Sequence, residues 1–364
     1  MTQLRNSTPR ADGFHMPPEW VQHACTWMLW PERTDNWRMG AKPAQKAFVA
    51  VAEAIARFEP LTMGVNQRQF QNARGMLPPQ VRVVELSNND AWMRDCGPTF
   101  VTNGKGEVRL VDWVFNAWGG LKGGLYFPWD LDDMVAEKVA DLESVDRYRA
   151  PLVLEGGSIH VDGEGTLLAT EECLLNENRN PELSKKEIEQ VLIDYTGVSK
   201  FIWLVAGVFN DETNGHVDNI ACFLRPGLLA LTWTDDHNDP QYPISKDAFD
   251  RLSKTKDAKG RKLNVIKVHQ PYPVLIASDE AEGVDAVDGS FPRHAGDRMA
   301  ASYINFYTCN GAAIVPIFND PHDKLAMDVL QMAMPERKFV GVPAREILLG
   351  GGNIHCITQQ QPRG

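Results

Sequence analysis

A seven-residue pattern that occurs twice constrains the fold of this chain more than any other feature of its sequence. Leu154–His160 and Leu349–His355 share L-x-G-G-x-I-H, with five identical residues. Asp95–Val101 aligns in turn with Glu155–Val161, and each of these two segments runs into a glycine-rich turn of the hairpin type. The chain is therefore expected to contain related supersecondary units.

The spacing of three polar residues supports the same interpretation. Asp95, Glu155 and His216 recur at intervals of about 60 residues, slightly longer than the usual repeat of a propeller. Such an array predicts units stacked around an axis, in which equivalent strand ends converge on one central site. The alternative is that glycine-rich segments before strands resemble one another by chance.

Helical and strand patterns alternate along the chain, which indicates the α/β class. Helices are expected at 41–58, at 184–196 with a capping box of Ser184 and Glu187, and at 320–334 with Pro321 in the first turn. The expected strands are 81–86, 151–154, 201–205, 219–224, 228–233, 264–268, 303–307 and 312–317.

Composition excludes several classes of protein. The chain has 364 residues, enough for two or three ordinary domains or for one closed repeat fold, and 43% of them are hydrophobic. The formal net charge of -11 argues against nucleic acid as a partner, because such binding needs a basic face. An acidic surface favours a cationic ligand, although it also serves solubility alone.

Six widely spaced cysteines without a CxxC pair predict neither a disulfide framework nor a zinc knuckle, and they suit a reducing compartment. The segment 1–13 is polar and unlike a signal peptide, and no apolar run is long enough to span a bilayer. A cytoplasmic protein without a membrane partner is expected.

Four short stretches concentrate reactive side chains, and the repeats would bring them together: Trp92–Asp95, Leu154–Gly157, Asn214–Asn219 and Gly350–Cys356. Such a meeting would place two aspartates, a glutamate, a histidine and a cysteine in one pocket.

Cys356 and His216 are the reactive centres of this hypothesis. Cys356 follows three glycines, which permit unusual backbone angles and close approach of a ligand, although most free cysteines are plain core residues. His216 and Asp218 are two apart, so on a strand both would face the same side, a proton-transfer histidine beside a binding carboxylate. A structural His–Asp pair is the alternative.

Asp95 and Glu155 complete the acidic cluster. Each residue has a simpler interpretation: Asp95 as the partner of Arg94 in an ion pair, and Glu155 as a turn residue. Buried unpaired carboxylates are costly, however, so a cluster of three requires cations. A planar guanidinium fits two carboxylates bidentately, and its charge would lower the pKa of the neighbouring thiol.

These residues resemble the agmatine deiminases of the peptidyl-arginine deiminase type, within the guanidine-modifying (pentein) superfamily. The resemblance covers nearly the whole chain and rests on an ordered set of motifs: Asp12–Trp20, Trp27–Arg33, Asp35–Arg38, Asn89–Asp95, Leu154–Ser158, Asn214–Asn219 and Gly350–Cys356.

The resemblance implies a five-bladed α/β propeller with pseudo-fivefold ββαβ repeats, formed by residues 1–364 as a single domain. It implies hydrolysis of agmatine to N-carbamoylputrescine and ammonia, a step toward putrescine, without a metal or cofactor. Cys356 becomes the nucleophile, His216 the acid and base, Asp95 and Asp218 the guanidinium ligands, and Glu155 the orienting carboxylate. A homodimer or homotetramer is the expected assembly.

Substrate specificity is less constrained. Trp92 and Trp113 are candidates to line the aminobutyl tail, and Glu212 to meet the distal ammonium, although the tryptophans suit a core and Glu212 a solvated loop equally well. A deiminase of free or peptidyl arginine stays open, because no residue can be assigned to or excluded from binding a substrate carboxylate.

Three other functions can be compared with this one: a metal-dependent ureohydrolase, a guanidinium-binding module and a phosphate-binding enzyme. Asp235–Asp239 contains D-x-H-x-D, a spacing of dimanganese ureohydrolases, but no second D-x-D-x-x-D cluster accompanies it and a polar turn explains it better. A guanidinium-binding module without catalysis would not need Cys356 and His216. Gly119–Gly124 lacks the spacing of a phosphate-binding loop and suits a flexible lid.

Overall fold

The computed structural model describes residues 2–364 and distributes their strands among five small sheets. In strand order, the sheets are β4 (Thr99–Thr102), β5 (Val108–Val114) and β6 (Arg147–Val153); β7 (Ile159–Val161), β8 (Thr166–Thr170) and β9 (Lys200–Leu204); β10 (Ala221–Arg225), β11 (Leu228–Trp233) and β12 (Asn264–His269); β13 (Tyr307–Cys309), β14 (Ala312–Ile317) and β15 (Lys338–Pro343); and β16 (Gln359–Pro362), β1 (His23–Leu29), β2 (Leu61–Val65) and β3 (Arg82–Glu85).

All five sheets share one pairing pattern. The first two strands of each sheet run antiparallel, and the second and third run parallel. Parallel neighbours need a crossover, and in every sheet that crossover contains at least one helix. The α/β class predicted from the sequence is confirmed. Four sheets are built from a succession of two strands, a helical crossover and a strand, and the fifth has a further parallel strand, β3, and takes its first strand, β16, from the other end of the chain.

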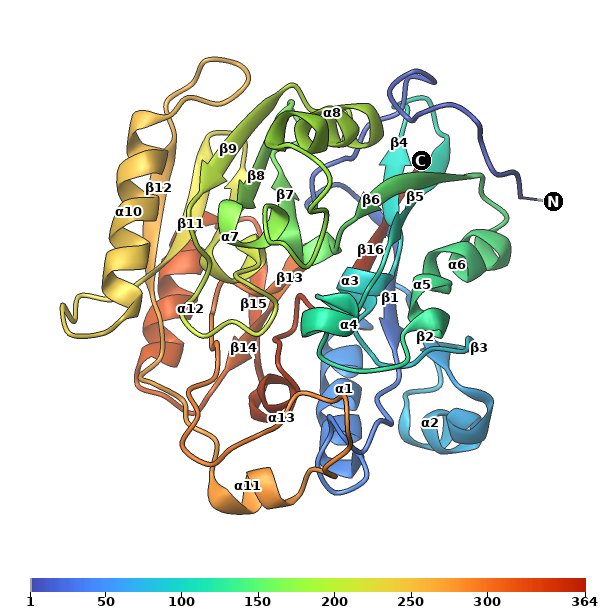
Figure 1. Ribbon diagram of the computed structural model, residues 1–364, viewed down its shortest axis with the longest axis vertical. Coiled ribbons are helices and arrows are strands. Elements are labelled where there is room, and N and C mark those ends of the chain that lie inside the picture. Colours follow the sequence, from blue (N-terminus) through green and yellow to red (C-terminus); the bar gives the residue numbers. More distant parts are fainter. Residues whose placement is uncertain (1) are drawn as a thin grey trace.

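Longer helices cover the outside of these sheets, as α6, α8 and α10 do in Figure 1. In chain order, the helices are α1 (Lys42–Ile55), α2 (Phe70–Met76), α3 (Met93–Cys96), α4 (Gly120–Gly123), α5 (Asp130–Asp133), α6 (Val135–Glu143), α7 (Glu171–Leu174), α8 (Lys185–Thr196), α9 (Val217–Ile220), α10 (Gln241–Lys254), α11 (Ser278–Glu282), α12 (His322–Ala333) and α13 (Arg345–Leu349), with 3-10 turns η1 (Gln67–Gln69) and η2 (Gly156–Ser158).

The expected elements agree with the observed ones except at 303–307 and around His216, where the helical turn α9 also covers the start of the strand predicted at 219–224. The capping box of α8 is present, and α1 buries Phe48, Val51 and Ile55 at helical spacing. The strand predicted at 303–307 is wrong, because β13 begins only at Tyr307. Residues 303–306 instead pack as an irregular segment in an apolar cluster beside β14 and α12.

The ends of the chain complete one sheet together. β16, near the C-terminus, pairs antiparallel with β1, so the red and blue strands lie side by side in Figure 1. A side-chain contact reinforces this pairing, since the buried Trp27 indole donates to Gln361 Oε1 at 2.8 Å. The fifth sheet therefore depends on contacts between residues more than 300 positions apart. Among residues 2–364, no helix has the length and apolar character to cross a membrane.

We expect the substitution Gln361→Ala to lower the free energy of unfolding by about 1–3 kcal/mol, because it leaves the buried Trp27 N–H without an acceptor. Urea denaturation measures the loss. Gln190→Ala is the matched control, since Gln190 lies on the exposed face of α8 and donates to Asp194, and its effect should stay within about 0.5 kcal/mol. Equal losses of the free energy of unfolding in the two variants would show that the contact between Trp27 and Gln361 does not stabilise the pairing of β1 with β16.

Candidate active site

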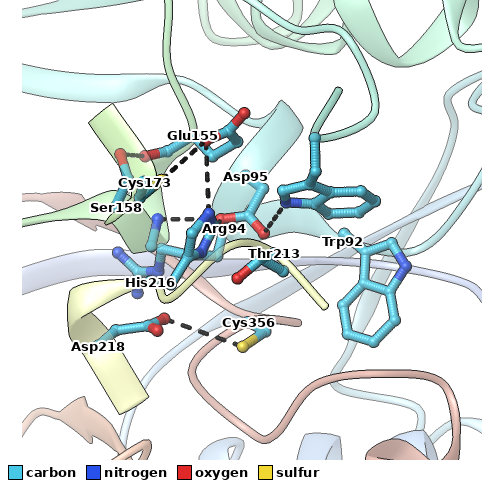
Figure 2. Close-up of polar contacts among 12 residues, drawn as sticks. Trp92, Arg94, Asp95, Glu155, Ser158, Cys173, Thr213, His216, Asp218 and Cys356 are labelled. Carbon is cyan, nitrogen blue, oxygen red and sulfur yellow. Dashed lines mark hydrogen bonds and ion pairs between the residues drawn. The ribbon is translucent and has the colours of Figure 1, made fainter. Parts of the chain in front are cut away.

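The predicted reactive residues lie at equivalent places in four different sheets. Asp95 is in α3 before β4, Glu155 precedes η2 and β7, Asp218 is in α9 before β10, and Cys356 precedes β16. Each residue therefore stands in a short turn that leads into the first strand of a sheet. Figure 2 shows these turns, drawn from distant parts of the chain, facing one another.

Gly157 marks the point where the side chains meet. A Cβ atom at this position would lie 2.6 Å from His216 Nδ1, 2.8 Å from Asp218 Oδ2 and 2.9 Å from Asp95 Oδ1. Only glycine fits where three polar side chains crowd the backbone, which explains the second glycine of the repeated motif. The convergence expected from the repeats is therefore present in the structure.

Glu155 is fully buried and its carboxylate is shared between two cations. Oε1 accepts from Arg179 Nε at 2.7 Å, and Oε2 lies 3.4 Å from His216 Nε2. Burial acts to raise the pKa of Glu155, but Arg179 and His216 hold it below its ordinary value. Glu155 is thus a buried anion that faces the histidine, rather than a turn residue.

His216 is placed by a helical turn and not by the strand that the sequence predicted. It is the residue before α9, so His216 and Asp218 point to different partners: the imidazole to Glu155 and, 3.9 Å away, to Asp95, and the carboxylate toward Cys356. Burial opposes a charged ring, yet Asp95 and the neighbouring groups raise the pKa of His216 well above its ordinary value. The ring is accordingly protonated at neutral pH.

Asp95 is held by two neutral donors. Gly157 N donates to Oδ1 at 2.9 Å and the Trp118 indole donates to Oδ2 at 3.1 Å. Burial raises the pKa of Asp95 to about 6, and the charges of Asp218 and Glu155 act in the same direction against that of His216. Trp118 adopts a positive φ of 62°, a strained conformation for a tryptophan that is common at functional sites.

Cys356 lies beside the second aspartate. Its Sγ is 3.8 Å from Asp218 Oδ2 and 3.5 Å from Asn305 Oδ1. Burial, followed by the charges of Asp218 and Asp95, raises the pKa of the Cys356 thiol well above its ordinary value. In the empty site the sulfur is therefore a neutral thiol, which becomes a thiolate only if a positive charge enters beside it.

A pocket lies over Cys356 and is lined by both aromatic and polar side chains. Trp92 and Trp118 line it together with Tyr126, Thr213, Asp95 and the backbone of 350–352. Trp92, predicted for this role, stacks on Trp37 with ring centroids 5.2 Å apart. Trp113 is not brought to the pocket: it packs against Tyr195 in the core and donates to Thr99 Oγ1. Trp118 lines the pocket instead of Trp113.

Two arginine–carboxylate pairs stand at the outer end of the pocket. Arg33 binds Asp35 with two hydrogen bonds of 2.8 and 2.6 Å, and Arg293 forms an ion pair with Glu212. The Glu212 side chain is only 15% exposed and is paired with the pocket-lining Arg293, so it is not a solvated loop residue. Its second oxygen, Oε2, is buried without a hydrogen-bond partner and lies next to the pocket-lining Gly351.

One trio in the site offers potential metal ligands. Glu155, Cys173 and His216 bring one such atom each within 4.8 Å of one another. The Arg179 guanidinium already occupies Glu155, and its charge would repel a second cation at this place. This arrangement is better suited to holding a proton on His216 than to holding a metal ion.

The D-x-H-x-D motif does not form a metal centre of the ureohydrolase kind. Asp235 pairs with His269, whereas Asp239 pairs with Arg298, so the two carboxylates point to different partners. The glycine-rich segment interpreted as a lid forms the short turn α4, and Leu121 on it is 86% exposed. Neither segment adds a reactive group to the pocket.

Two residues of the site escaped the sequence analysis. Arg179 lies outside every motif, and only the need of buried Glu155 for a cation pointed to such a partner. Asn305 occupies, before β13, the place that Asp95 and Asp218 hold before β4 and β10. The repeat would have indicated Asn305 if its spacing had been regular, but the long segment 270–306 interrupts the period.

Comparisons with known proteins agree with this site. Residues 15–362 match the Porphyromonas-type peptidyl-arginine deiminase family. The chain is 60% identical to the agmatine deiminase of Pseudomonas aeruginosa, with 98% of this chain and 97% of that protein covered. It is 58% identical to the agmatine deiminase of Ectopseudomonas mendocina, with 100% and 99% covered.

Solved structures show the same relationship. The agmatine deiminase of Enterococcus faecalis superposes with a TM-score of 0.97 at 53% identity, and each chain is covered completely. Because the family match extends over nearly all of the sequence and the relatives align end to end, the chain belongs to the Porphyromonas-type peptidyl-arginine deiminase family and, with these relatives, to the agmatine deiminases within it.

Proposed function

We propose that the protein hydrolyses agmatine to N-carbamoylputrescine and ammonia through a covalent amidino-cysteine intermediate. The observation that carries this proposal is the position of the Cys356 sulfur 3.8 Å from Asp218 Oδ2, while the side chains of Asp95 and His216 converge with Asp218 at Gly157. The relatives named as agmatine deiminases support this choice of substrate.

Binding of the guanidinium is assigned to two aspartates. Asp218 Oδ1 is buried without a partner, and the Asp95 carboxylate lies across Gly157 from it. A planar guanidinium placed between them satisfies both acids with charge-assisted hydrogen bonds. Its central carbon then lies within reach of the Cys356 sulfur, as an addition step requires.

Charge balance explains how the thiol becomes reactive. In the empty site the anions Asp95 and Glu155 are matched by the cations His216 and Arg179, and the sulfur is neutral. Entry of one guanidinium adds a positive charge, which lowers the pKa of the Cys356 thiol and favours loss of its proton. The substrate thereby activates its own nucleophile.

The chemistry then uses His216 twice. The thiolate adds to the guanidinium carbon, and His216 gives its proton to the departing nitrogen, so that ammonia leaves and a carbon–sulfur bond remains. The neutral imidazole next takes a proton from water, and the hydroxide adds to the same carbon. Breaking of the carbon–sulfur bond frees the ureido product, and the proton of the added hydroxyl passes to the departing sulfur, which restores the neutral thiol whose first proton was lost to solvent. Glu155 keeps the ring oriented through both steps.

Specificity is assigned to the outer end of the pocket. Glu212 Oε2, the unpartnered oxygen next to Gly351, is suited to the distal ammonium of agmatine. The rival substrate, free or peptidyl arginine, would need a cation for its carboxylate or carbonyl. Arg33 and Arg293 are near, but each is already neutralised by Asp35 or Glu212, so the pocket favours an ammonium.

We extend the proposal to the molecule as a whole. Five sheets with one pairing pattern, whose entry turns supply the site, support a five-bladed α/β propeller with pseudo-fivefold ββαβ repeats formed by a single domain. Six free cysteines, five of them buried, support work in a reducing compartment such as the cytoplasm. A homodimer or homotetramer and a role in putrescine synthesis remain expectations from the resemblance.

Cys356→Ala should reduce ammonia release from agmatine by a factor of about 10⁴ or more, because no other group can form the covalent intermediate. Calorimetry should still detect agmatine binding to this variant. Cys309→Ala, which removes a buried sulfur from β13, is the control and should retain turnover within about twofold. Substantial turnover by the Cys356 variant would overturn the mechanism.

The pH dependence should report Asp95. Because its pKa is raised to about 6, the carboxylate is ionised above this value and protonated below it, where it no longer holds a cation. We expect kcat/KM for agmatine to fall about tenfold per pH unit below about pH 6. Circular dichroism at each pH separates this loss from unfolding, and a constant kcat/KM down to about pH 5 would contradict the role of Asp95.

Glu212→Gln should raise KM for agmatine by about tenfold or more, with a smaller effect on kcat, because the distal ammonium lies far from the reacting carbon. The substitution also releases Arg293, so the preference for agmatine over arginine should decrease. An unchanged ratio of kcat/KM between the two substrates would remove Glu212 from the specificity site.

A further inference from the structure

A second buried charge cluster lies behind Asp218 and is not used by the mechanism above. The His355 ring is clamped between two carboxylates: Nδ1 lies 2.8 Å from Asp218 Oδ2, and Nε2 lies 2.8 Å from Glu19 Oε1. All three residues are at most 6% exposed. His355 directly precedes Cys356, so this clamp is attached to the nucleophile segment itself.

Hydrogen-bond chemistry fixes the state of the ring. A carboxylate oxygen can only accept, so both ring nitrogens of His355 must donate, and a neutral imidazole has a single N–H. With both acids ionised, this geometry holds an imidazolium between two anions. Charge-assisted bonds of this length on both sides hold the ring and the two carboxylates in one fixed arrangement.

The other charged or titratable groups around the ring come from several elements. Arg94 in α3 approaches Glu19 Oε1 at 3.3 Å, and its guanidinium also donates to Gln360. His160 in β7 has Nε2 3.8 Å from Glu19, while its Nδ1 accepts from the backbone of β10. Cys222 in β10 lines the same small cavity, and Cys356 follows in the chain.

The position of the Asp218 carboxylate depends on His355 more than the position of the Asp95 carboxylate depends on any single neighbour. Both oxygens of Asp95 receive donors, from Gly157 and Trp118. Asp218 has only His355 as a firm hydrogen-bond donor, on Oδ2, because the contact with the Cys356 sulfur is 3.8 Å and Oδ1 has no partner. Without the imidazolium, this carboxylate would be free to rotate.

We propose that His355 is a positioning residue, which as an imidazolium between Glu19 and Asp218 fixes the Asp218 carboxylate and leaves its Oδ1 for the guanidinium. The proposal rests on the function proposed above, in which Asp218 binds the substrate. Glu19 contributes by keeping His355 charged at the pH at which the enzyme works.

The environment of the ring agrees with this role. Burial and the charge of Arg94 act to lower the pKa of His355, but Glu19 and Asp218 raise it above its ordinary value. The positioned state is therefore complete at low pH and is lost as the pH rises through the pKa of His355 in the folded enzyme. Removing the charge of Glu19 must shift this loss to lower pH.

Two substitutions at His355 distinguish a positioning role from a purely structural role. Asn places its amide nitrogen near the position of Nδ1 and can still donate to Asp218, whereas Gln reaches toward Glu19 instead. We expect His355→Gln to raise KM for agmatine by about tenfold or more and His355→Asn to raise it only severalfold. Equal effects of both variants on KM would overturn the positioning role.

The substitution Glu19→Gln supplies a test that is independent of changes at His355. The Gln amide oxygen can still accept from Nε2, so the shape is kept while the charge is lost. We expect the alkaline limb of kcat/KM to move to lower pH by about one unit or more. The affinity of agmatine for the Cys356→Ala variant should show the same shift when Glu19→Gln is added. If the alkaline limb of kcat/KM does not move and the rate falls equally at every pH, Glu19 and His355 have only a structural role.

Glu59→Gln is the matched control, because Glu59 forms an equally buried pair with His23 at 3.0 Å and lies apart from the pocket. It should lower stability without moving the pH profile. The wild-type protein distinguishes the two levels of the hypothesis. If it releases no ammonia from agmatine, the proposed function fails; if it does and the variants leave KM and the limb unchanged, the inference about His355 alone fails.

Discussion

The buried pair of Arg179 and Glu155 is the interaction on which the rest of the site depends. Besides Glu155, the Arg179 guanidinium binds the carbonyls of Trp118 and Thr213 and the side chain of Asn214. One cation thus ties together three loops, those that carry the indole over Asp95, the acid–base histidine and the carboxylate that faces it. Leaving Glu155 without its partner would cost about 3–5 kcal/mol, since a lone buried charge is far more expensive than a buried pair. The pair is best understood as an organiser of catalytic geometry, because a buried ion pair by itself adds little stability over apolar residues of the same volume.

Close backbone approach is the second requirement of this architecture. The turns that carry the reactive groups meet so closely that side chains are excluded at their contact points. A Cβ at Gly157 would overlap the acid–base cage, and one at Gly352 would lie 2.6 Å from the Trp92 ring and 3.1 Å from the Cys356 sulfur. The glycines of the repeated motif are therefore consequences of convergence, and the absence of a side chain at Gly352 leaves room for the Cys356 sulfur at the pocket wall.

The sequence was informative wherever a residue belonged to the repeat and weak elsewhere. Asp95, Glu155 and Cys356 could be found because each lies in one of the aligned segments at the entrance to a first strand, and Asp218 because it stands two residues after His216, which continues the interval of about 60 residues. The secondary structure around His216 was misjudged, because a four-residue helical turn leaves no periodicity to detect. Trp113 and Trp118 cannot be told apart by composition: they are five residues apart, and only the strained turn after β5 sends Trp118 into the pocket. Arg179 and Asn305 depend on tertiary contacts that no local pattern encodes.

Two charge clusters lie on opposite sides of Asp218, and in each of them acidic side chains are balanced by cationic ones. The clusters differ in whether this balance changes during the reaction. In front, Glu155 and Asp95 are balanced by Arg179 and His216, so the cage is neutral until the substrate brings one more positive charge. Behind, Asp218 and Glu19 are balanced by His355 and Arg94, and no further charge is needed. The front cluster must be able to change in the proposed mechanism, in which His216 gives and regains a proton in every cycle. The rear cluster must stay constant, because a carboxylate that turned away or gained a proton would release the cation that makes the Cys356 thiol acidic. Separating a variable cluster from a fixed one through a single shared aspartate lets the same buried site hold a cation firmly and still move protons.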